Sequence, residues 1–216
     1  MKKTIVLSAA LLLGACSNNP PVPDWQMNAH GELERAETAY LSGKDSVEKA
    51  EFARARADIA STGQVGLVIR AELARCALRV AALVFEECAG FEALRQDATP
   101  ADIAYAAYLN GNARAQDTAL LPEQHKAVAA AGTDVAAATA MQAIADPLSR
   151  LVAAGALFRA SRATPAVLAT ATDTASAQGW RRALLAWLNV QALRAEQAGD
   201  IQEAARLRRR IALATP

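Results

Sequence analysis

Three residue pairs, each a capping residue followed by proline, place the strongest constraint on how this chain can fold. The pairs are Thr99-Pro100, Asp146-Pro147 and Thr164-Pro165. A Thr or Asp side chain at a helix N-cap accepts hydrogen bonds from first-turn amides, and proline at the next position has no amide to leave unpaired. The sequence therefore predicts helices that begin near residues 100, 147 and 165.

The spacing of apolar residues predicts helix along most of the remaining chain, because no stretch alternates apolar and polar residues for long. The first helix is expected to bury Leu33, Ala36, Tyr40 and Leu41 and to end at Gly43. The second, capped by Asp45, is expected to bury Val47, Ala50, Ala53 and Ala57 and to end near Gly63. Short turns between such segments indicate an all-α fold of antiparallel helical hairpins.

The segment from Val65 to Phe85 is apolar on nearly every side, so we expect it to be the most buried helix. Further helices are predicted from Pro122 and from Gly179-Trp180, and Gly199-Asp200 precedes the last one. Trp180 and Trp187 lie two helical turns apart and should both face the core. On the last helix, the residues expected to face inward are Ile201, Ala204, Ala205 and Ile211.

The final pair of predicted helices resembles a tetratricopeptide repeat over one 34-residue unit. The resemblance is carried by small and apolar residues at matching spacings, namely Ala192, Ala195, Gly199, Ala204, Ile211 and Pro216. Arg208 stands where the repeat has a large aromatic residue. The resemblance implies a short, degenerate α-solenoid rather than a regular array of repeats.

Residues 1–15 have the pattern of a secretory signal peptide, with Lys2 and Lys3 ahead of an apolar run from Ile5 to Leu13. The run is too short to span a bilayer stably. It leads into Leu13-Gly14-Ala15-Cys16, which resembles the lipobox of bacterial lipoproteins. The resemblance implies cleavage between Ala15 and Cys16, and acylation of Cys16 with chains such as palmitate. The alternative is an ordinary signal peptide with an incidental cysteine.

The residues after Cys16 bear on where the protein is anchored. Ser17 follows the cysteine where inner-membrane lipoproteins tend to have Asp, which favours the outer membrane with the protein facing the periplasm. Proline-rich residues 16–24 form an expected tether. Residues 25–216 then suffice for one helical domain, with Asp24 as an N-cap and Trp25 packed against the domain.

Cys76 and Cys88 are candidates for a disulfide, because the periplasm is oxidising. In one continuous helix they would lie about 18 Å apart, whereas a disulfide needs Cα atoms roughly 4.4–6.8 Å apart. A bridge therefore requires the helix that begins near Val65 to end before Cys88. Two free, buried thiols are the alternative.

The charges are unevenly distributed. Residues 17–146 carry 18 acidic and 11 basic side chains, and residues 147–216 carry 4 acidic and 10 basic ones. The basic end includes Arg206, Arg208, Arg209 and Arg210, which form either a solvated helix face or a docking patch for an acidic partner. Compositional drift would also produce this imbalance. Nucleic acid is not an expected partner in the periplasm.

Catalytic patterns are scarce, and we predict no metal site, no cofactor and no enzymatic activity. His30 and His125 are both expected at the surface. The adjacent carboxylates Glu86 and Glu87 are expected to be a solvated pair at a helix end, since neighbours on a helix face apart. The sequence thus favours a lipid-anchored scaffold that binds an envelope protein. The alternative is an enzyme or ligand-binding protein acting on cell-wall or lipid material, which a deep cleft with a buried carboxylate would favour.

Overall fold

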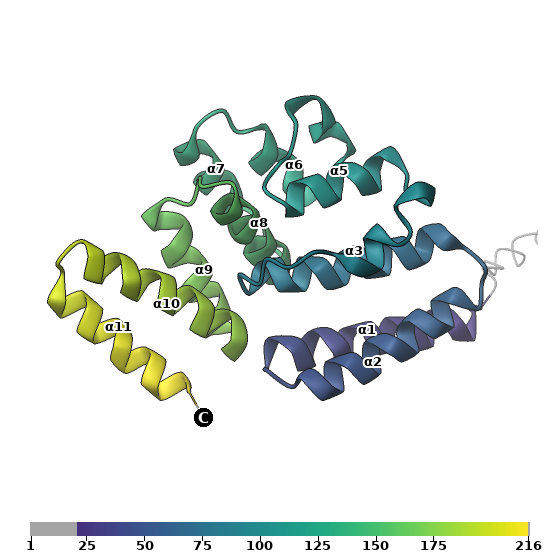
Figure 1. Ribbon diagram of the computed structural model, residues 1–216, viewed down its shortest axis with the longest axis horizontal. Helices are drawn as coiled ribbons and strands as arrows, with labels where there is room; N and C mark the ends of the chain where they lie inside the picture. Colours follow the sequence, from purple (N-terminus) through teal and green to yellow (C-terminus); the bar gives the residue numbers. More distant parts are fainter. Residues whose placement is uncertain (1–20, 216) are drawn as a thin grey trace, which may run out of the picture.

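The computed structural model describes residues 21–215, whose helices are joined by turns and loops and which contain no strand (Figure 1). The all-α prediction is therefore confirmed. In chain order, the α-helices are α1 (Asp24–Leu41), α2 (Asp45–Ala60), α3 (Val65–Ala81), α4 (Ala89–Glu92), α5 (Pro100–Leu109), α6 (Glu123–Ala130), α7 (Asp134–Gln142), α8 (Pro147–Arg159), α9 (Pro165–Ala177), α10 (Arg181–Gln197) and α11 (Ile201–Ala214). Two 3-10 helices, η1 (Arg95–Asp97) and η2 (Ala115–Leu120), flank α5.

The three predicted N-caps are confirmed. The Thr99 hydroxyl accepts from the amide of Asp102 at 3.2 Å, and the Asp102 carboxylate accepts from the amide of Thr99 at 2.9 Å, which is a capping box. Asp146 accepts from the amide of Ser149 at 2.7 Å, and Thr164 accepts from that of Val167 at 3.3 Å. Proline follows each cap at the first helical position.

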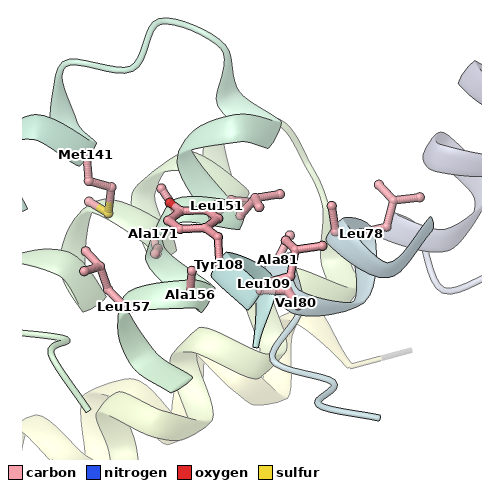
Figure 2. Packing of buried hydrophobic residues seen from close by; sticks show 14 of the residues in the cluster. Leu78, Val80, Ala81, Tyr108, Leu109, Met141, Leu151, Ala156, Leu157 and Ala171 are labelled. Carbon is pink, nitrogen blue, oxygen red and sulfur yellow. The ribbon is translucent and has the colours of Figure 1, made fainter. Parts of the chain in front are cut away.

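The main core lies where α3, α5 and α8 meet, and α7, α9 and α10 close it (Figures 1 and 2). Trp187 of α10 is fully buried in it, and its indole nitrogen donates to the carbonyl oxygen of Ala81 at 3.0 Å. Trp180 is only partly buried, at the N-cap of the same helix. The predicted core position of Trp187 is confirmed, and Trp180 lies at the edge of this core.

The hairpin of α1 and α2 has a small core of its own, below α3 in Figure 1. Phe52 and Ile59 of α2 are buried there against Ala36 of α1 and Val68 of α3. Trp25 packs against this cluster, as predicted, although Asp24 is the first helical residue and Pro23 holds the N-cap position. The hairpin is thus a separate unit of packing joined to the rest of the molecule along one side.

The predicted buried face of α2 is wrong. Val47, Ala50, Ala53 and Ala57 are exposed, and the inward face carries Glu48, Phe52, Ala55 and Ile59. The larger apolar area of Phe52 and Ile59 outweighs that of the alanines. Glu48 can also be buried because arginines pair with it. Asp45 does not cap this helix, since Lys44 holds the N-cap position and no side chain bonds there.

Two further boundaries differ from the sequence analysis. The helix that begins at Val65 ends at Ala81, before Phe85. On α11, Ile201 and Ala205 face solvent, whereas Ala204 and Leu207 are buried against α10. The predicted inward positions of Ala204 and Ile211 are confirmed, and Leu207 lies between them on the same face.

Several predictions lie outside the described residues. These concern the signal segment, the cleavage position at Ala15, the acylation of Cys16 and the start of the tether. None of the described helices combines the length and apolar character needed to cross a membrane.

Candidate functional site

The disulfide between Cys76 and Cys88 is present, with Cα atoms 5.8 Å apart, so this prediction is confirmed. The chain can reach back because α3 ends at Ala81 and Leu83 adopts φ of 58°. The amides of Leu83 and Val84 donate to the carbonyl oxygens of Val80 and Arg79 at 3.0 and 2.9 Å. These bonds close the last turn of α3 and direct residues 84–88 back along the helix.

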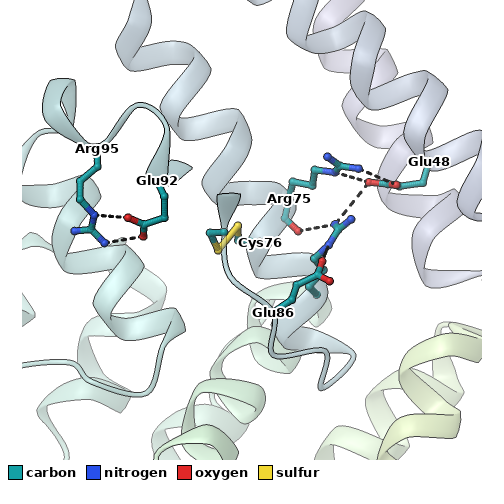
Figure 3. Close-up of a disulfide and its surroundings, with 8 residues drawn as sticks. Glu48, Arg75, Cys76, Glu86, Glu92 and Arg95 are labelled. Carbon is teal, nitrogen blue, oxygen red and sulfur yellow. Dashed lines mark hydrogen bonds and ion pairs between the residues drawn. A yellow bond between two sulfur atoms is a disulfide. The ribbon is translucent and has the colours of Figure 1, made fainter. Parts of the chain in front are cut away.

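Next to the disulfide, a buried carboxylate joins α2 to α3 (Figure 3). Glu48 of α2 is 1% exposed. It accepts two hydrogen bonds from Arg75 of α3, from Nε at 2.7 Å and from Nη2 at 3.3 Å. Arg79 approaches the same carboxylate at 3.7 Å. The two arginines thus neutralise a charge that could not be buried alone.

Arg79 also bonds Glu86 of the disulfide-closed segment, through Nε. Glu86 and Glu87 are exposed and lie beyond the end of α3. The two carboxylates are therefore exposed near a helix end, as predicted, but their contacts differ. Glu86 is bound to the arginine cluster, and Glu87 has no ion-pair partner among residues 21–215.

A second buried carboxylate also joins α2 to α3. We call this contact between the α1–α2 hairpin and its neighbouring helices the joint. Glu72 of α3 is 6% exposed and accepts from Nε of Arg56 on α2 at 2.7 Å. Its carboxylate packs directly on the backbone of Gly90, where any Cβ would overlap it. A side chain at residue 90 would therefore displace the Glu72 carboxylate from its present position.

Tyr40 of α1 completes the joint between the hairpin and the other helices. Its ring lies under the guanidinium groups of Arg79 and Arg182, 5.2 and 4.4 Å from their central carbons. Burial raises the pKa of the Tyr40 hydroxyl. Arg182 of α10 also donates to the carbonyl oxygen of Tyr40 at 2.7 Å and pairs with Asp45. Arginines of α3 and α10 therefore add polar and cation–π contacts to the apolar packing that holds the hairpin.

The four arginines of α11 do not form one cluster. Arg206 makes two 2.6 Å bonds to Glu203, which lower the pKa of that carboxyl and raise the pKa of Arg206. Arg208 faces α10, where it bonds Glu196 at 2.9 Å and Asn189 at 3.3 Å. Arg209 and Arg210 have no carboxylate partner within the described part of the chain.

Most other arginines of the basic half have a structural role at helix ends. They donate to carbonyl oxygens that end or follow a helix, where the helix dipole is negative. The donors are Arg150, Arg162, Arg181, Arg182 and Arg194, and the acceptors are Ile144, Ala131, Ser42, Tyr40 and Ala163, respectively. These internal contacts account for much of the positive charge after residue 146, so no partner protein is needed to explain it.

The predicted surface position of His125 is wrong. The side chain is 1% exposed and lies between Tyr105 and Tyr108, with ring centroids at 5.8 and 4.9 Å. Its Nδ1 lies 3.3 Å from the Tyr108 hydroxyl, and burial lowers its pKa to about 4. The polar residues around it in sequence suggested exposure, but α6 turns His125 and Val128 inward together. His30 is exposed, as predicted.

A hollow of about 100 Å³ lies beside this cluster, lined by Tyr108, Val128, Leu157 and Arg162 among others. Its lining includes no carboxylate. Residues 21–215 also contain no group of three or more His, Cys, Asp or Glu side chains that could hold a metal ion.

No protein-family model, no curated protein and no solved structure matches this chain.

Proposed function

We propose that this protein is a lipid-anchored lipoprotein of the outer membrane, whose helical domain faces the periplasm and binds an envelope protein. The observation that carries the proposal is the sequence Leu13-Gly14-Ala15-Cys16 after a charged start and an apolar run. Acylated Cys16 would then hold the domain at the membrane through the proline-containing tether.

The outer face of α11 is the proposed docking surface. Gln202, Arg206, Arg209 and Leu213 follow one another at helical spacing and are all exposed. Leu213 is 88% exposed, and Arg209 has no carboxylate partner among the described residues. An acidic protein surface with an apolar patch would complement this stripe in charge and polarity.

We further propose that the hairpins form a degenerate tetratricopeptide-like solenoid. The small residues Ala192 of α10 and Ala204 of α11 are buried where the two helices approach, as that repeat requires. Asp200 caps α11 by accepting from the amide of Glu203 at 3.0 Å. Each hairpin would then leave one face for a partner.

The anchor is tested by replacing Cys16 with Ser. The wild-type chain should incorporate radiolabelled palmitate and fractionate with the outer membrane, whereas Cys16→Ser should give uncleaved precursor or soluble protein without label. A Cys16→Ser protein that remains in the outer membrane, with its mass changed only by the substitution, would show that the lipobox prediction is wrong.

The docking surface is tested by chemical crosslinking in intact envelopes, followed by mass spectrometry of the crosslinked partners. The variant Arg206→Glu/Arg209→Glu reverses the charge of the stripe, and Lys49→Glu is the control, since Lys49 is exposed on α2. The charge reversal should abolish a crosslink that the wild type and the control both make. Equal crosslinking of all three proteins would exclude α11 as the docking surface.

A further inference from the structure

The segment from Ala82 to Gly90 touches both buried ion pairs that join the α1–α2 hairpin to α3. In its middle, Glu86 bonds Arg79, and Arg79 approaches the Glu48 carboxylate at 3.7 Å. At its end, Gly90 packs against the Glu72 carboxylate, which Arg56 of α2 binds at 2.7 Å. One short segment thus reaches the surroundings of both buried carboxylates between α2 and α3.

The disulfide is the covalent link that keeps this segment in place. Cys88 lies between Glu86 and Gly90, and its partner Cys76 lies between Arg75 and Arg79 on α3. Beyond Gly90 the chain is fixed independently, because Phe91 is fully buried in the main core. Opening the disulfide would therefore release residues 84–90, which are exposed or half-buried, while Ala82 and Phe91 stay in the main core.

The backbone at the start of the segment favours release. Leu83 has φ of 58°, a conformation that costs a non-glycine residue about 1 kcal/mol. Such a conformation persists only when the surroundings enforce it. The amide bonds of Leu83 and Val84 to α3, the Cys76–Cys88 bond and the contact of Phe85 with Phe158, at 6.1 Å between ring centroids, together supply that constraint.

We propose that the Cys76–Cys88 disulfide is a reducible cross-link that controls how tightly the α1–α2 hairpin is held to α3. The reductant would be a dithiol. Its thiolate attacks Sγ of Cys88, which is only half-buried, and the S–S bond breaks. Cys76, which is 8% exposed, leaves as a thiolate and takes up a proton. The second thiol of the reductant then attacks the mixed disulfide, releases Cys88 and leaves the reductant as a disulfide. This proposal does not depend on the lipid anchor or on the docking surface of α11.

The test is hydrogen exchange of the full chain, followed by mass spectrometry before and after treatment with dithiothreitol under native conditions. Reduction should speed amide exchange in residues 45–60 by on the order of tenfold, the effect of losing one charged hydrogen bond at the joint. Exchange in α8 and α10 should be unchanged. Faster exchange confined to residues 82–92, loss of protection throughout the core, or a disulfide that dithiothreitol reduces only in denaturant would each overturn the proposal.

A second comparison leaves the disulfide intact. Glu86→Gln removes the charge that bonds Arg79, and Glu87→Gln is the matched control one residue away, with no ion pair among the described residues. Glu86→Gln should speed exchange in residues 45–60, and Glu87→Gln should leave it at the wild-type rate. Equal rates in both variants would show that the segment does not act on the hairpin through Arg79.

Discussion

Gly155 of α8 packs directly against the carbonyl oxygen of Val80 in α3. A Cβ atom at residue 155 would overlap that backbone oxygen, so no side chain can be accommodated without moving one helix. This contact lies in the main core and sets how closely α3 and α8 approach. Since α3 also carries Cys76, Arg75 and Arg79, the same contact fixes the position of the joint with the hairpin.

Gly155→Ala should therefore lower the free energy of unfolding by about 1–3 kcal/mol, because the added methyl forces two helices apart. Gly66→Ala is the matched control, since a Cβ at this position in α3 meets nothing within 4 Å. Alanine should there raise stability by up to about 1 kcal/mol. Urea unfolding followed by circular dichroism measures both. A Gly155→Ala protein as stable as wild type would contradict the contact.

Ser161, two residues after the end of α8, has φ of 59° and is exposed. Glycine adopts this conformation without the steric cost that a Cβ imposes, so Ser161→Gly should raise the free energy of unfolding by about 0.5–1 kcal/mol. Ser161→Ala removes the hydroxyl but keeps the Cβ, and should give no gain. If thermal unfolding showed equal gains in both variants, the backbone conformation would not be the cause.

The helix starts could be predicted from sequence because capping is local. Thr99, Asp146 and Thr164 each bond an amide three residues further on, whatever the rest of the chain does. The disulfide was predictable for a related reason, since Cys76 and Cys88 are the two cysteines of the described residues and lie only 12 residues apart.

The inward faces were harder to predict, because burial depends on partners distant in sequence. Glu48 is buried only because Arg75, 27 residues away, binds it. Likewise, His125 is buried because Tyr108, 17 residues earlier, provides both a ring and a hydroxyl. A polar residue with such a partner is indistinguishable in sequence from one that faces solvent. In an alanine-rich helix such as α2, the faces differ too little in apolar character to indicate which one is buried.

The disulfide should be complete in protein exported to the periplasm. With Cys16 acylated, unfolded protein should present no alkylatable thiol before reduction and two after it. Cys76→Ser and Cys88→Ser both open the loop, which should cost about 2–3 kcal/mol of stability. Cys76→Ser should cost more, because Cys76 is 8% exposed and the serine hydroxyl would be buried there, whereas Cys88 is half-buried. Two thiols that react before reduction would contradict the native disulfide.

Burial of His125 should make stability depend on pH in the mildly acidic range. The folded-state pKa of His125 is lowered to about 4, against an unfolded value of 6.5. Between these values the unfolded chain binds a proton that the folded protein excludes, so stability should fall as pH falls from about 6.5 to about 4, and this contribution should then level off. The full shift corresponds to at most about 3 kcal/mol. The measurement is the free energy of unfolding in urea at several pH values. His125→Phe should flatten the curve over this range, and His30→Phe, at an exposed position, should reproduce the wild-type slope. A slope that persists unchanged in His125→Phe would assign the pH dependence to other groups.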